Sequence, residues 1–174
     1  MHGVSHSRVF WVLLMLFGII MEACGLYFQY SLSLNPCVKC VYERALIACF
    51  ILAGFIGFVS PDMFVTRGLA ILVFLASSGY GTWVAYNHNL EVYASDYQAK
   101  CSLVAHFPSM LPLDQWLPWM FSPTGACQDI YWSLFGFGIP EWVIAIFGCG
   151  CVVSLVMLLN EFFRIRTDYG SLYR

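Results

Sequence analysis

The segment Asn35-Pro36-Cys37-Val38-Lys39-Cys40-Val41-Tyr42-Glu43-Arg44 places a Cys-x-x-Cys pair directly before a long apolar run. Proline suits the first turn of a helix, where its missing N–H would have no partner, so Pro36 predicts a helix that begins at the cysteines. The free N–H groups and the dipole of a helix N-terminus stabilise a thiolate. Arg44 lies four residues after Cys40, which puts a permanent cation on the same helix face as that sulfur. The pattern predicts a reactive cysteine pair.

Two cysteines at this spacing also occur in zinc sites and in static disulfides. A structural zinc site usually has four Cys or His ligands, often in two paired clusters. The sequence contains no second Cys-x-x-Cys pair. We therefore predict redox chemistry and no metal, with a structural disulfide and a metal site as the alternatives.

The composition indicates where this chemistry takes place. The chain has 174 residues, of which 60% are hydrophobic and only 10% are charged, and its mean hydropathy is +0.74. Soluble domains carry about 25% charged residues. The sequence therefore predicts an integral membrane protein, and its net charge of −2 argues against nucleic acid as a partner.

Four apolar runs are long enough to cross a bilayer, which takes about 20 helical residues. The first run is too long for the apolar core of a signal peptide and has no cleavage site of small residues, so we expect it to be retained. Only helices or closed barrels satisfy the backbone in lipid. We predict one all-α membrane domain over residues 1–174, a bundle of four helices with spans at about 9–30, 41–59, 68–87 and 142–160. Glycines in two spans offer places for close helix approach: Gly79, Gly81, Gly148 and Gly150.

The basic residues predict the orientation of the bundle. One side carries Arg8, Arg67, Arg164, Arg166 and Arg174, and the other carries Lys39, Arg44 and Lys100. By the positive-inside rule both termini are cytoplasmic. The loops at about 31–40 and 88–141 then emerge together on the opposite face.

The long loop contains a second pair of cysteines, Cys101 and Cys127, with 25 residues between them. In an oxidising compartment such a pair is expected to form a disulfide. That disulfide could simply staple the loop. A second, activated pair on the same membrane face favours the other reading, in which the two pairs exchange electrons by thiol–disulfide exchange.

Residues 107–121 of this loop are rich in aromatic residues and leucine but contain three prolines. The segment is too interrupted to be a span and too apolar to be a solvated loop. We expect a short helix in the membrane interface, which would hold the loop disulfide near the bilayer surface. Packing over the top of the bundle is a compatible alternative.

Several motifs follow one another along essentially the whole chain. In order they are Glu22, Cys37-x-x-Cys40-x-x-x-Arg44, Tyr86-Asn87-His88, Cys101, Leu111-Pro112-Leu113-Asp114, Cys127, Trp132 and Pro140. In this order the chain resembles the DsbB family, the quinone-dependent thiol oxidases of the bacterial inner membrane. Each motif is weak alone, and their joint order carries the resemblance.

The resemblance implies a reaction and its participants. A reduced periplasmic thioredoxin-fold protein resembling DsbA would attack Cys101, and the released Cys127 would bond transiently with Cys37. Cys40 would then donate to a quinone, either ubiquinone or menaquinone. Arg44 could stabilise both the Cys40 thiolate and the charge that develops on a quinone oxygen. His88 resembles the family histidine that follows the third span and could donate to the quinone, and Glu22 is a further candidate because it is an acidic group within a span. The resemblance also implies a multi-pass protein of the bacterial inner membrane with its active cysteines in the periplasm.

The energetics agree with a quinone. The reduction potential of the DsbA couple is about −120 mV, so its reoxidation needs a strong electron acceptor. The sequence has no Gly-x-Gly-x-x-Gly fingerprint of a nicotinamide or flavin site. A lipid-dissolved quinone is therefore the expected cofactor.

Other single residues have two readings. Glu22 and His88 are either functional groups or structural polar anchors. Lys39 departs from the apolar residues common between the two cysteines in the family, and we expect its charge to make that disulfide more oxidising. The cysteines within the spans, which are Cys24, Cys49, Cys149 and Cys151, are expected to be apolar fillers.

Two rival functions remain. A vitamin K epoxide reductase type enzyme is also a four-span bundle, but there the active Cys-x-x-Cys lies near the end of the bundle's sequence. A tetraspan scaffold with a stapled loop would leave Arg44 and the reactive pair without a role.

Overall fold

The computed structural model describes residues 4–92, 105–108, 111–125 and 133–172, with side chains as far as residue 163. Four of its helices are long and apolar enough to cross a membrane. They are α1 (Arg8–Ser31), α2 (Val38–Val59), α3 (Phe64–Val92) and the first part of α6 (Ile139–Leu172). A short 3-10 helix, η1 (Val4–His6), precedes α1. The predicted all-α membrane bundle is confirmed.

Two helix ends differ from the prediction. Helix α2 begins at Val38 with Cys37 as its N-cap, so Pro36 precedes the helix and does not occupy its first turn. The Sγ atom of Cys37 accepts a hydrogen bond from the backbone N–H of Cys40 at 3.2 Å and so takes the capping role itself. Helix α3 continues to Val92, so His88 is a helical residue and does not start the loop as predicted.

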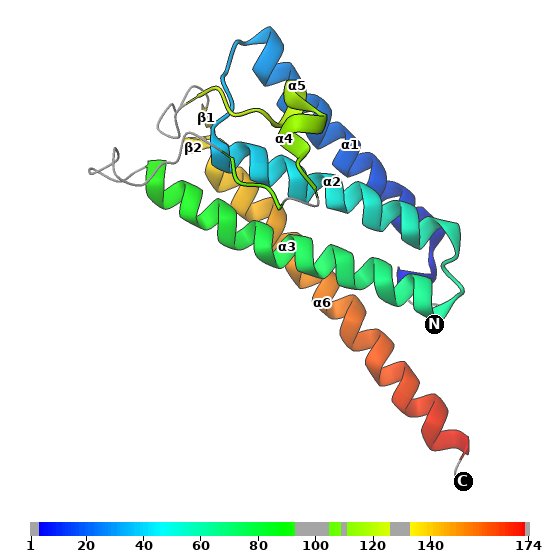
Figure 1. Cartoon of the computed structure of the whole chain (residues 1–174). Helices are drawn as coiled ribbons and strands as arrows, with labels where there is room; N and C mark the ends of the chain where they lie inside the picture. Colours follow the sequence, from blue (N-terminus) through cyan, green and yellow to red (C-terminus); the bar gives the residue numbers. More distant parts are fainter. Residues whose placement is uncertain (1–3, 93–104, 109–110, 126–132, 173–174) are drawn as a thin grey trace.

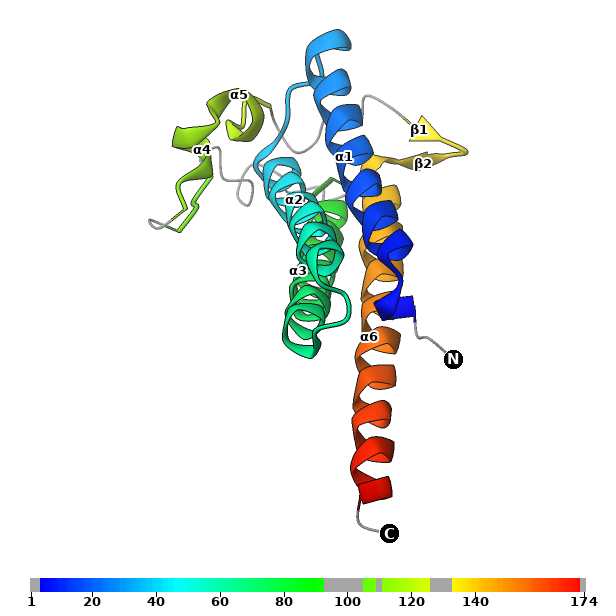
Figure 2. The same cartoon turned by 90° about the vertical axis from the view of Figure 1, so that its right-hand side faces the viewer.

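The helices pack in sequence. Helix α2 lies between α1 and α3, and α3 packs against α6 (Figures 1 and 2). An aromatic core joins three of them, with the Phe50 ring 5.0 Å from Phe74 and 5.5 Å from Phe147 in edge-to-face geometry. The link between α1 and α2 and the C-terminal end of α3 lie at one end of the bundle, and η1 and the far part of α6 lie at the other.

Two of the four glycines predicted to allow close helix approach do lie against a neighbouring helix. A Cβ on Gly81 would lie 2.4 Å from the Phe147 ring, and one on Gly150 would lie 2.8 Å from Ser78 Oγ. Gly79 and Gly148, by contrast, have open space beside them. Gly57 makes an approach that we did not predict, because a Cβ there would overlap the ring of Trp11. The rotation of each helix decides which glycine faces a neighbour.

A buried ion pair closes the end of the bundle opposite the cysteines. Arg67 of α3 donates to both carboxylate oxygens of Glu161 of α6, at 2.9 and 2.8 Å. Ser5 also donates to Glu161, and Arg67 donates to the carbonyl of Pro61 at 2.8 Å. Arg67, counted above as a charge in a loop, is therefore a buried link between α3, α6 and the N-terminal segment.

The described part of the long loop forms two small structures. Residues Leu113–Trp116 (α4) and Pro118–Phe121 (α5) form two one-turn helices where one short helix was expected. Strands β1 (Ser133–Leu134) and β2 (Phe137–Gly138) form an unpredicted antiparallel hairpin directly before α6. Its two turn residues, Phe135 and Gly136, both have positive φ, as a type I′ turn requires.

Candidate functional site

The Cys-x-x-Cys pair lies at the N-terminus of α2, as the sequence predicts. Cys37 is buried and Cys40 is half-buried, and their sulfurs are in contact at 2.8 Å. Cys37 is the N-cap, where the helix dipole and the Cys40 N–H both stabilise negative charge on its sulfur. The local sequence is sufficient to create this feature.

A histidine–glutamate pair from two helices faces Cys37. The Nε2 atom of His88 lies 3.5 Å from Cys37 Sγ, and its Nδ1 atom lies 2.9 Å from Oε1 of Glu43. All three residues are buried. When Nδ1–H donates to the Glu43 carboxylate, Nε2 of the neutral ring is free to accept the proton of the Cys37 thiol. The arrangement is a nucleophile, a base and a group that orients the base.

The same cluster bears on the metal alternative. The ligand atoms of Cys37, Cys40 and His88 lie within 4.8 Å of one another, close enough to hold an ion. Within the described residues this is one ligand fewer than a structural zinc site usually has. The capped and hydrogen-bonded sulfurs suit thiol chemistry without a metal.

A second charged pair crosses from α2 to α3 one turn closer to the loops. The Nζ atom of Lys39 lies 3.5 Å from Oε1 of Glu91. Lys39 precedes Glu43 by four residues on α2, and Glu91 follows His88 by three on α3. The two helices therefore carry two polar pairs beside the cysteines, with the acidic residue on α3 in Lys39–Glu91 and on α2 in Glu43–His88.

Arg44 connects α2 to α1 and to the loop. Its guanidinium donates to the carbonyl of Gly25 at 2.8 Å, to the carbonyl of Met120 at 3.2 Å and to the side chain of Gln29. All three acceptors are uncharged, and in the described part of the chain no carboxylate lies within ion-pair distance of Arg44. Its positive charge is therefore held in place by uncharged hydrogen-bond acceptors.

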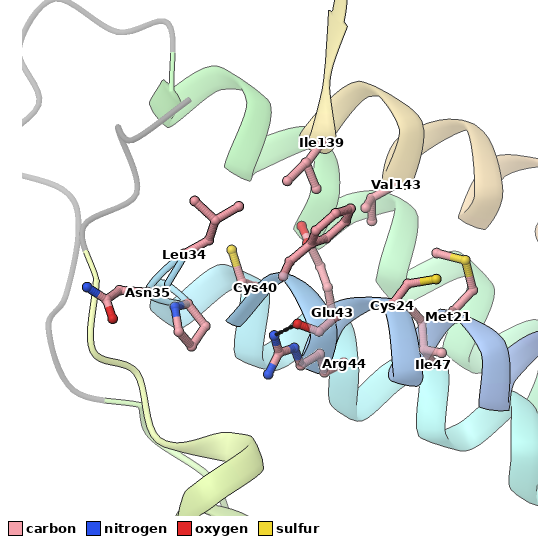
Figure 3. A pocket seen from close by; sticks show the side chains of 13 residues that line it. Met21, Cys24, Leu34, Asn35, Cys40, Glu43, Arg44, Ile47, Ile139 and Val143 are labelled. Carbon is pink, nitrogen blue, oxygen red and sulfur yellow. Dashed lines mark hydrogen bonds between the residues drawn. The ribbon is translucent and has the colours of Figure 1, made fainter. Parts of the chain in front are cut away.

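Cys40 and Arg44 line one cavity of about 160 Å³ between α1, α2 and the start of α6 (Figure 3). Most of the wall is apolar, with Met21, Phe28, Leu34, Pro36, Ile47, Ile139 and Val143 among the lining residues. Cys24, which we expected to be only a filler, also lines it. The prediction that Arg44 shares a face with the Cys40 sulfur is confirmed, and that shared face looks into the cavity.

The long loop docks beside the cysteines at two points. The backbone N–H groups of Thr124 and Gly125 donate to the carbonyl of Pro36 at 2.9 and 3.1 Å. The backbone N–H of His106 donates to the Tyr42 hydroxyl of α2 at 2.7 Å. A Cβ on Gly125 would lie 2.3 Å from the carbonyl oxygen of Asn35. Only glycine permits the backbone to approach this closely.

The other predicted site residues either do not line the cavity or lie outside the described residues. Glu22 is buried in α1, and its carboxylate has no hydrogen-bond partner in the part of the chain that the structure describes. It lies close enough to Arg44 for an electrostatic interaction but does not line the cavity. His88 does not line it either. Cys101 and Cys127 lie outside the described residues.

Comparison with known proteins agrees with this geometry. The family model "Disulfide bond formation protein DsbB" matches residues 7–157. The chain is 38% identical to Disulfide bond formation protein B of Histophilus somni, over 95% of this chain and 94% of that protein. It is also 38% identical to the protein of that name from Actinobacillus pleuropneumoniae, over 98% of this chain and 96% of that protein.

The chain belongs to the DsbB family. It is accordingly a membrane disulfide bond formation protein and a disulfide-forming oxidoreductase. Family membership confirms the resemblance that the order of the sequence motifs indicated.

The sequence reading missed three participants in the site of this DsbB-family protein. Glu43 and Glu91 carried no signal beyond being acidic residues near a cysteine motif or near a span end. The docking of Gly125 was equally hidden, although its position two residues before Cys127 was a hint. Each depends on a neighbour distant in the chain, so local pattern could not reveal it.

Proposed function

We propose that this DsbB-family protein is a thiol oxidase of the bacterial inner membrane. It takes two electrons from a periplasmic thioredoxin-fold dithiol protein resembling DsbA and transfers them to a membrane quinone, ubiquinone or menaquinone. The observation that carries the proposal is that Cys40 and Arg44 line the same cavity between α1, α2 and α6.

The cavity suits a quinone head group. A cavity of about 150 Å³ accommodates a benzene ring, and this one measures about 160 Å³. Apolar side chains from three helices match the ring, and the positive charge of Arg44 matches a carbonyl oxygen. A bound quinone supplies an acceptor for two electrons and two protons. Arg44 would bind and orient that oxygen and favour negative charge on it.

Thiol–disulfide exchange links the loop to this cavity. A thiolate of the reduced partner attacks Cys101 of a Cys101–Cys127 disulfide, forms a mixed disulfide and releases Cys127 as a thiolate. Cys127 then attacks Cys37 of the Cys37–Cys40 disulfide and releases Cys40 as the thiolate that faces the cavity. The partner's second thiol then attacks the mixed disulfide, closes the partner's own disulfide and releases Cys101 as a thiolate. Cys101 attacks Cys127 of the Cys37–Cys127 disulfide, which re-forms the Cys101–Cys127 disulfide and leaves Cys37 and Cys40 reduced.

The complete exchange moves two electrons from the partner to the Cys37–Cys40 pair. The partner dithiol loses two electrons and two protons as its disulfide forms, and the Cys37–Cys40 disulfide gains both as it opens. Cys101 and Cys127 end the cycle as the disulfide in which they began. The two electrons leave the protein only through Cys40.

The docked loop supports this route. Gly125 is hydrogen-bonded beside Pro36 and precedes Cys127 by two residues. Two residues of chain span at most about 7 Å. Because Pro36 is the chain neighbour of Cys37, we propose that two residues after the docked Gly125 are enough for Cys127 to reach Cys37 during the exchange.

His88 manages the proton of Cys37 in this scheme. Its Nε2 atom faces the sulfur, and Glu43 holds the ring from the other side. The histidine accepts a proton when the thiol forms a disulfide and returns it when the disulfide opens. Roles for His88 and Glu22 in direct contact with quinone remain predictions.

The test is quinone reduction by the purified protein in detergent, with a reduced DsbA-like dithiol protein as the donor. We expect reduction by the natural chain and none by Cys40→Ser or Cys101→Ser. Cys49→Ser is the matched control on α2, because Cys49 is a free cysteine whose sulfur bonds only locally to the carbonyl of Ala45. Quinone reduction that survives in Cys40→Ser would contradict the proposal.

A further inference from the structure

We infer that Glu91 sets the redox potential of the Cys37–Cys40 pair by neutralising Lys39, the cation placed between the two cysteines. The inference rests on the proposed redox role of that pair. It names Glu91 as a positioning residue that acts through Lys39, since its carboxylate is bonded to the ammonium group.

Lys39 occupies an electrostatically unfavourable place. It is the second residue of α2, where the helix dipole presents its positive end and favours acidic side chains. The side chain is also only 23% exposed, so water screens its charge poorly. A lysine held there needs an anion from another element.

Glu91 supplies that anion from α3. Its Oε1 atom lies 3.5 Å from Lys39 Nζ, and its side chain is 17% exposed. Its Oε2 atom is buried and has no hydrogen-bond partner among the described residues. Lys39 is therefore the group that compensates the carboxylate, and each charge depends on the other.

The pairing alters what the sequence alone predicts. An unpaired Lys39 would stabilise the electron-rich sulfurs of the reduced pair and make the disulfide more oxidising. An unpaired Glu91 would act in the opposite direction. With both charges present, their fields largely cancel at the sulfurs. The redox potential of the pair then depends on the N-terminus of α2 and on the neighbouring Glu43–His88 pair.

The opposite signs of the two charges give the test. The Cys37–Cys40 disulfide accepts two electrons and two protons from a reference dithiol, which becomes a disulfide, and the equilibrium constant measures the potential. We expect Glu91→Gln to shift that constant about fivefold to tenfold toward the reduced pair, or about 20–30 mV. Lys39→Met should shift it similarly toward the disulfide. The double variant should return close to the natural value, and Lys39→Arg should leave it unchanged.

The measurement uses quinone-depleted full-length protein in detergent, with Cys101 and Cys127 replaced by serine so that one pair exchanges. The protein is equilibrated with the reference dithiol without oxygen, and the thiols of Cys37 and Cys40 are counted by alkylation and mass spectrometry. Asp62→Asn is the control, because Asp62 lies in the turn between α2 and α3 at the opposite end of the bundle.

Unchanged equilibrium constants in both single variants would overturn the inference. Shifts of the same sign in both would also overturn it, because a general loss of packing acts in one direction, whereas the two opposite charges act in opposite directions. If Glu91→Gln does not fold, the comparison of the equilibrium constants of Lys39→Met and Lys39→Arg still tests the inference. Quinone reduction by the intact chain is assayed separately. A protein that shows the shifts but never reduces quinone would refute the proposed function and leave this inference standing.

Discussion

The imidazole of His88 is held against the carboxylate of Glu43, with Nδ1 2.9 Å from Oε1. The contact joins α3 to α2 across 45 residues of sequence and turns Nε2 of the ring toward Cys37. A cysteine at a helix N-terminus gains its activation from the backbone alone. Here a base is added that only the packing of two helices can supply.

Replacing His88 by Gln should slow thiol–disulfide exchange at Cys37 by about 10²-fold, because proton transfer then depends on water. Glu43→Gln should slow it less, because the ring remains but loses its ionic partner. The rate is measured by trapping the exchange of a small dithiol with Cys37 over a range of pH. Asn87→Ala is the control, since Asn87 is a half-buried residue of α3 that bonds to the carbonyl of Trp83 in its own helix. An unchanged rate and pH profile in His88→Gln would remove the role of the histidine.

Arg44→Ala should lower the rate of quinone reduction by about 10²-fold, the usual effect of deleting a charge-stabilising donor. Arg44→Lys should recover part of that loss, because it keeps the charge but not the fork of donors. Gln29→Ala removes one acceptor of the guanidinium and keeps the cation, so its rate should remain near that of the natural chain. The three rates are compared in one quinone assay. Equal rates in Arg44→Ala and Gln29→Ala would show that the charge is not required.

Gly125→Val should displace the loop from Pro36, because the added Cβ would overlap the carbonyl of Asn35. We expect slower electron transfer from the loop cysteines to Cys37 but normal reduction of Cys37–Cys40 by a small dithiol. Rapid mixing with each donor separates these steps. Thr124→Val keeps the backbone N–H that bonds to Pro36 and is the matched control. Normal rates with the protein donor would mean that loop docking does not guide the exchange.

Breaking the Arg67–Glu161 pair should affect stability and not electron transfer. Arg67→Met leaves a buried carboxylate without its ion-pair partner, which costs about 3–5 kcal/mol of the free energy of unfolding. The double change Arg67→Met and Glu161→Met should cost less, because no charge is left buried alone. Unfolding in mixed micelles measures both. If the single and double variants lose the same stability, the pair is not coupled.

Local sequence was enough for a large part of the fold. Four apolar runs of about bilayer length predict four spanning helices because backbone polar groups in lipid must be satisfied within the helix. The site at the start of α2 was equally predictable, because a Cys-x-x-Cys before an apolar run and an arginine one turn later are local relationships. The hairpin before α6 was not predicted, since Phe135 is an unusual residue for a turn with positive φ.

The sequence by itself determined the membrane bundle, the cysteine pair at the start of α2 and the cation on its helix face, because hydropathy and helical spacing act over a few residues. Only the tertiary structure decided which charges meet. The pairs Glu43–His88, Lys39–Glu91 and Arg67–Glu161 each join two helices through residues far apart in the chain. Such pairs depend on the rotation and depth at which helices pack, and those are set by all the side chains of the interface together.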